Sequence, residues 1–217
     1  MIYYLAYFAY YVSLLFALVC CLYRYKVLDA ASKVLAILVC CAFVNEGAAF
    51  YLEKKYHNNL PLYAIYCLIE FFILCLYFNK IIDVFIRRNF GIYIGIFGIV
   101  LGALNIIFVQ HMNNLNSYFL LFEGLSVIGM SLFAFFRLLL KYDTFYLYKY
   151  PHFWFISILI FFWSITFITW GLYDYINLKL GHRAWKINFG ILTVGVITYV
   201  SFGCVFLMYP KLRSINE

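Results

Sequence analysis

The sequence predicts an all-α protein, a polytopic membrane helix bundle, and two observations support this prediction. Of the 217 residues, 67% are hydrophobic and only 12% are charged, whereas a soluble domain has about 25% charged residues. Seven apolar stretches also have the length, about 20 residues, that a helix needs to cross the hydrocarbon core of a membrane. We therefore expect seven transmembrane helices in a single transmembrane domain over residues 1–217.

The expected spans follow one another with short connectors. They cover residues 2–23, 34–52, 60–78, 90–109, 118–140, 152–173 and 184–208. Pro61 stands in the first turn of the third span, where a proline is tolerated, and Tyr209-Pro210 is expected to end the seventh. The connectors leave no room for a soluble catalytic or DNA-binding domain, so we expect no nucleic-acid partner.

Positive charge in the connectors predicts the orientation, because Lys and Arg are enriched on the cytoplasmic side of membrane proteins. Eleven of the sixteen basic residues fall on one side of the expected bundle: Arg24, Lys26, Lys33, Lys80, Arg87, Arg88, Arg137, Lys141, Lys149, Lys211 and Arg213. This bias predicts the N-terminus outside and the C-terminus in the cytoplasm. With the acidic residues counted, the whole formal charge of +7 lies on the inner face, which favours anionic lipid head groups as partners.

Small and aromatic residues mark one face of two spans. Gly91, Gly95, Gly98 and Gly102 recur at helical spacing in the fourth span, and small residues at this spacing allow two helices to approach closely in lipid. We expect a seam inside the bundle, with a homodimer seam as the alternative. A tyrosine stripe on the first span is interpreted as an interfacial belt or a packing face, with a ligand-stacking wall as the alternative: Tyr3, Tyr7, Tyr10 and Tyr11.

Charged and amide side chains inside the apolar stretches are the candidate binding or ion-pairing residues. Glu70 is the deepest, in the middle of the third span. A carboxylate at the centre of a span costs about 2.5–3.5 kcal/mol to insert, so it needs a partner or a task. In the predicted orientation the whole set lies at mid-depth or in the outer half of the membrane: Glu46, Glu70, Glu123, Lys186, Asn45, Asn105 and Asn188. We expect these side chains to meet in one cavity that opens outward.

The charges within this set do not balance. Three carboxylates and one ammonium cannot all pair, so at least one Glu is expected to be protonated or to bind a cation. We expect Glu70 to be the neutral one, and Glu46 or Glu123 to pair with Lys186. Three interpretations stay open: contacts between helices only, a ligand or ion site, or proton handling.

Catalytic templates do not occur in the sequence. HExxH, GxSxG, paired-aspartate and CxxC motifs are absent, and no two histidines have metal-ligand spacing. We expect no cofactor and no metal, and a non-enzymatic sensor or regulatory subunit with an outward-facing polar cavity. The alternatives are an ion- or proton-coupled transporter or pore-forming effector, and a membrane-embedded lipid-modifying enzyme.

Three segments carry a resemblance to a known family: Asn59–Tyr66 with Glu70-Phe71, Asn116-Ser117-Tyr118 with Glu123, and Pro151-His152-Phe153-Trp154. Over residues 58–171 the chain resembles a family of short, uncharacterised seven-helix bacterial inner-membrane proteins, often encoded beside sensor histidine kinases. Trp185-Lys186 in the last span departs from that pattern. The resemblance implies a multi-pass protein of the bacterial inner (plasma) membrane that takes part in signalling through a partner such as a sensor kinase.

Overall fold

The computed structural model is all α-helical over the residues that it describes, which are 2–141, 147–180 and 185–213. The long helices are α1 (Ile2–Arg24), α2 (Ala30–Tyr56), α3 (Leu60–Ile81), α5 (Phe90–Phe108), α6 (Ser117–Lys141), α7 (Pro151–Gly171) and α9 (Trp185–Arg213). Short helices lie between them: η1 (Tyr25–Val27), α4 (Asp83–Arg88), η2 (Leu147–Lys149) and α8 (Tyr173–Leu180). Seven helices are long and apolar enough to cross a membrane, which confirms the predicted helix bundle.

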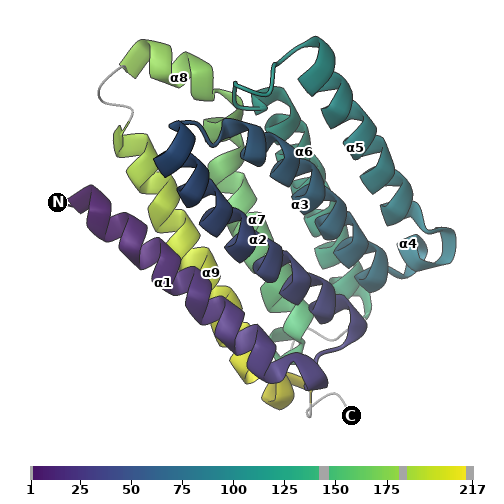
Figure 1. Cartoon of the computed structure of the whole chain (residues 1–217). Coiled ribbons are helices and arrows are strands. Elements are labelled where there is room, and N and C mark those ends of the chain that lie inside the picture. The colour runs from purple at the N-terminus through teal and green to yellow at the C-terminus, as the bar shows by residue number, and fades with distance from the viewer. Residues whose placement is uncertain (1, 142–146, 181–184, 214–217) are drawn as a thin grey trace.

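Six of the long helices form a closed ring, and α5 packs outside it (Figure 1). Around the ring, α1 packs on α2, α2 on α3, α3 on α6, α6 on α7, α7 on α9, and α9 back on α1. We call the end of the bundle that carries α8 and the α2–α3 connector the α8 end. The opposite end, with η1 and the start of α7, is the η1 end (Figure 1).

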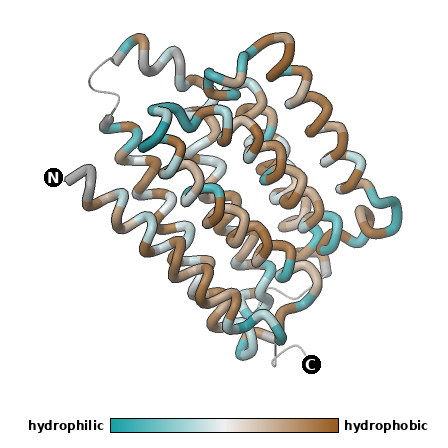
Figure 2. Tube along the Cα trace, in the orientation of Figure 1, coloured by the Kyte–Doolittle hydropathy of each residue, from teal (hydrophilic) through white to brown (hydrophobic). Residues whose placement is uncertain are grey.

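Hydrophobic residues predominate along the helices, and hydrophilic residues gather mainly toward the helix ends and connectors (Figure 2). Large side chains such as Phe8, Phe97 and Phe108 are exposed there. In water this surface would be unfavourable, but hydrocarbon is an equally apolar solvent, so these side chains lose nothing by facing lipid. The surface therefore fits a multi-pass membrane protein.

The helices α2 and α9 run further than the apolar pattern predicts. The second span is expected at residues 34–52, but α2 begins at Ala30, after Asp29 caps it by accepting a hydrogen bond from the Ser32 amide (2.7 Å), and it continues to Tyr56. Hydropathy marks the membrane-length window, whereas the cap and the polar end turns extend the helix beyond it.

The expectation that Tyr209-Pro210 ends the last helix is wrong, because α9 continues through Pro210 to Arg213. Residue 184, the expected start of that span, lies outside the described residues.

The glycine stripe of α5 packs against α3. All four glycines are buried, and a Cβ at Gly91 would lie 2.6 Å from the Cys75 carbonyl oxygen of α3. A Cβ at Gly98 would meet the Phe71 ring, and one at Gly102 would meet Leu68 and Phe119. The seam expected inside the bundle is therefore present, and this face of α5 is occupied by its own chain rather than open to a second copy.

Candidate functional site

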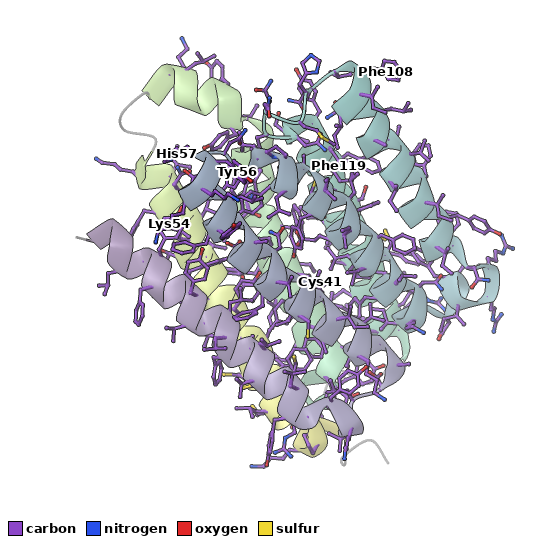
Figure 3. The ribbon with its side chains drawn as sticks, in the orientation of Figure 1. Cys41, Lys54, Tyr56, His57, Phe108 and Phe119 are labelled. Atoms are coloured by element: carbon purple, nitrogen blue, oxygen red, sulfur yellow. The ribbon has the colours of Figure 1, made fainter. Side chains whose placement is uncertain are left out.

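A cavity of about 320 Å³ lies inside the helix ring, toward the α8 end. Its wall is built from α1, α2, α3, α6, α7 and α9, together with the start of α8 and the connector before α6. Asn59 at the start of α3 and Tyr173 of α8 line it near the α8 end, and Glu70 and Tyr199 line it at a deeper level. Figure 3 shows the polar end of α2, with Lys54, Tyr56 and His57, at this same end of the bundle.

Glu46 of α2 is held by two tyrosine hydroxyls in this cavity. Tyr10 Oη of α1 donates to Glu46 Oε1 and Tyr63 Oη of α3 donates to Glu46 Oε2, both at 3.1 Å. Hydrogen bonds to a carboxylate are stronger than those between neutral groups. The Glu46 carboxylate thus joins three helices of the ring at one point.

Glu70 lies on the same face of α3 as Tyr63, two turns deeper into the bundle, and also lines the cavity. Its carboxyl group interacts electrostatically with Glu46 and is close enough to influence Tyr66 and Tyr199. Among the described residues it makes no hydrogen bond and no ion pair. The cavity is therefore lined by two carboxyl groups, of which Glu46 has hydrogen-bond partners and Glu70 has none within the described part of the chain.

Glu123 of α6 lies next to this pair but outside the cavity. Its side chain is 0% exposed, and neither carboxyl oxygen has a hydrogen-bond partner among the residues that the structure describes. The Glu123 carboxyl group is close enough to interact electrostatically with Glu70, and also with Cys67 and Cys75 of α3. The three predicted carboxyl groups thus form a series from the cavity into the protein core, rather than one pocket.

The predicted ion pair between Lys186 and Glu46 or Glu123 is wrong. Lys186 is exposed in the first turn of α9, does not line the cavity, and forms no ion pair with either carboxylate. Neutral tyrosine hydroxyls take the place of the ammonium at Glu46. Asn45 is buried on α2, but it is not a lining residue either.

The remaining two predicted asparagines have different roles. Asn188 of α9 lines the cavity. Asn105 instead secures the α5–α6 connector: its Nδ2 donates to Gln110 Oε1 (3.0 Å) and to Asn116 Oδ1. Gln110 Nε2 also donates to Ser117 Oγ at the start of α6 (2.7 Å). This amide cluster positions Asn116, which lines the cavity and was not among the predicted residues.

Aromatic residues that the sequence analysis did not single out as site residues form a large part of the wall. They come from α3, α7, α9 and α8, and they are Tyr63, Tyr66, Phe162, Trp163, Trp170, Tyr173 and Tyr199. Tyr7 and Tyr10 of the predicted stripe also line the cavity, which favours the ligand-wall interpretation of these two side chains. The spacing of Tyr63, Tyr66 and Glu70 in α3, three and then four residues apart, places them on one helix face and is the sequence signal for this wall.

A second polar cluster, at the η1 end, was also missed by the sequence analysis. Asp29 Oδ2 lies 2.8 Å from His152 Nε2, and Tyr77 Oη lies 3.2 Å from His152 Nδ1. The Asp29 amide donates to Tyr209 Oη at 3.2 Å. Burial disfavours the Asp29 carboxylate, but hydrogen bonding and attraction from His152, with the Ser32 amide, outweigh it and hold the pKa of Asp29 well below its usual range. The cluster joins the ends of α2, α3, α7 and α9.

A larger hollow of about 730 Å³ lies between α7 and α9. It is lined almost entirely by apolar side chains, among them Trp154, Phe161 and Val205, with Lys149 and Lys211 also contributing. Its wall contains no carboxyl group among the described residues, so the predicted polar residues do not meet there. The cavity with Glu46 and Glu70 is the candidate functional site.

The fold and the cavity define a class. Over the described residues, the chain is an α-helical membrane-type bundle with seven span-length helices and an acidic, aromatic cavity among six of them. Comparison of the chain with protein-family models, with curated proteins and with solved structures gives no match.

Proposed function

We propose that the protein is an integral membrane receptor or regulatory subunit, in which a ligand enters the cavity and changes the packing of the surrounding helices. The single observation that supports this is the Glu46 clamp. The Glu46 carboxylate joins α1, α2 and α3 through Tyr10 and Tyr63, and all three side chains line the cavity. A ligand that competes for these hydroxyls alters a contact between helices, so occupancy of the cavity is coupled to helix arrangement.

The proposed orientation follows from the excess of Lys and Arg at the η1 end. With that end in the cytoplasm of a bacterial cell, the cavity opens to the outside and the ends of α2, α3, α7 and α9 joined by the Asp29–His152 cluster face the cytoplasm. A partner such as a sensor kinase would then read the helix arrangement within the membrane or from the cytoplasmic side.

Glu70→Gln is expected to abolish the cellular response while the protein still accumulates in membranes. Transcript profiles are compared between cells that lack the gene and cells that express the wild-type protein, Glu70→Gln or Glu53→Gln. Glu53 is an exposed acid at the end of α2, so Glu53→Gln is a matched control and should give the wild-type profile. A wild-type profile for Glu70→Gln at normal protein level would contradict the proposal.

Glu123 supports a second candidate function, a proton-coupled transporter. A buried carboxyl group without a partner is most stable when neutral, and Glu46, Glu70 and Glu123 form a series of groups that can bind protons. Proton flux into proteoliposomes under a pH gradient separates the two functions. The receptor proposal expects no flux above that of protein-free liposomes, whereas flux that is lost in Glu123→Gln would establish transport.

A further inference from the structure

The charge of the cavity wall indicates the sign of its ligand. Glu46 and Glu70 are the two acidic side chains in the wall, and its described residues include no Lys, Arg or His. Lys186, which would have neutralised one carboxylate, is exposed elsewhere. Because a buried carboxylate requires a counter-charge or a proton, a cation in this cavity supplies what the described residues of the wall do not.

The aromatic wall indicates the kind of cation. Tyr66, Tyr199 and Trp163 line the same cavity as Glu70, and further tyrosines line it toward the α8 end. The faces of aromatic rings attract cations, and the attraction is strongest for ammonium groups that have lost their water, as in aromatic cages for quaternary ammonium ligands. Apolar ring faces also contact the carbon substituents of such a ligand.

The arrangement of donors argues against a bare metal ion as the ligand. Metal ions such as calcium need six or more oxygen ligands, and no group of three or more His, Cys, Asp or Glu side chains within the described ranges is placed to hold one. The volume of about 320 Å³ instead falls at the lower end of the range for pockets that enclose small organic ligands, about 300–1,000 Å³.

We propose that the cavity binds a small organic ammonium cation, with the Glu70 carboxylate as its counter-ion and the tyrosine and tryptophan rings as its cage. Glu70 takes this role because it has no partner within the described chain, whereas Glu46 already accepts two tyrosine hydrogen bonds. Asn116 and Asn188 also line the cavity and offer amide groups to a polar substituent on the ligand. This inference deepens the proposed function and rests on it.

The test uses charged probes and an uncharged probe of the same shape, with the full-length protein in lipid nanodiscs. The charged probes are choline and benzyltrimethylammonium, and the uncharged probe is dimethylbutanol, the carbon isostere of choline. Two of the four tryptophans, Trp163 and Trp170, line the cavity, so intrinsic fluorescence reports binding. At least one charged probe should bind, and dimethylbutanol should bind about tenfold more weakly or not at all.

Variants assign the binding to Glu70. Glu70→Gln should weaken binding of the cation by about tenfold or more. The affinity of Glu70→Asp, which keeps the charge, and that of Glu53→Gln should stay within a few-fold of the wild type. If Glu70→Gln does not fold, Glu46→Gln tests the same requirement for negative charge in the cavity. Equal binding of dimethylbutanol, unchanged affinity in a folded Glu70→Gln protein, or no binding of either cation would overturn the proposal.

The failure of this inference can be told apart from failure of the receptor function. If neither cation binds but Glu70→Gln still gives the transcript profile of the deletion, the cavity serves a receptor for a different ligand class. If the cations bind and require Glu70, but the Glu70→Gln profile is that of the wild type, the cation site stands and the receptor function falls.

Discussion

Replacing Phe71 with alanine is expected to lower the free energy of unfolding by about 3–5 kcal/mol, the cost of truncating a fully packed phenylalanine. The Phe71 side chain is 0% exposed. Its ring packs edge-on against Phe119 (centroids 5.8 Å apart) and is tilted against Phe122 (5.5 Å), both on α6. It also covers Gly98 of α5. Because packing rather than water exclusion holds helices together in lipid, the void left at this junction of three helices is not compensated.

The partner substitution tests the same contact from the opposite side. Gly98→Ala places a methyl group against the Phe71 ring and should cost about 1–3 kcal/mol as overpacking. In the double variant the alanine methyl group enters the space that the ring has left, so the two costs should be less than additive. Gly129→Ala on α6 is the control, because nothing lies within 4 Å of a Cβ there.

Reversible unfolding in mixed detergent micelles gives these free energies. A loss below about 1 kcal/mol for Phe71→Ala would mean that the α3–α5–α6 junction does not contribute to stability as its packing indicates. Strict additivity of Phe71→Ala and Gly98→Ala would show that the ring and the glycine are not in contact.

The number of long helices follows from the sequence because bilayer thickness sets a length that apolar stretches must match. The glycine seam of α5 follows for a similar reason, since four small residues on one face have few other uses in lipid. α8 and α4 do not follow, because short polar helices at the ends of spans carry no hydropathy signal. The extension of α2 depends on the cap formed by Asp29, which an apolar window does not detect.

The candidate site could be predicted only in part from the sequence. Burial cost alone identifies Glu46 and Glu70 as residues that need partners, and both line one cavity. Which partner each carboxylate finds depends on the rotation of each helix and on which helices are neighbours. Tyr10 reaches Glu46 because α1 closes the ring against α2 and α9. Lys186 is expected at a depth in the membrane similar to that of Glu46, but it lies on an exposed face of α9. Counting charges alone therefore predicts the wrong partner for the carboxylate.

Asp29→Asn is expected to destabilise the protein near neutral pH and to have little effect in acid. Asparagine is as good a helix cap as aspartate, so the substitution keeps the cap of α2 and removes the charge that faces His152. A charge-assisted hydrogen bond contributes about 1.5–3 kcal/mol. The Asp29 side chain is 39% exposed, which allows solvent screening, and we expect a loss of about 1–2 kcal/mol.

The pH dependence has a definite sign. The folded pKa of Asp29 is depressed below the unfolded value, which is about 3.9 for an ordinary aspartate. The stabilisation is therefore fully present above about pH 4 and is lost as the pH falls from there toward the lower folded pKa. Thermal unfolding of nanodisc samples between neutral and acidic pH should show the wild type and Asp29→Asn converging in acid, while Glu53→Gln runs parallel to the wild type. A constant difference between wild type and Asp29→Asn at every pH would mean that the Asp29 charge does not hold the η1 end together.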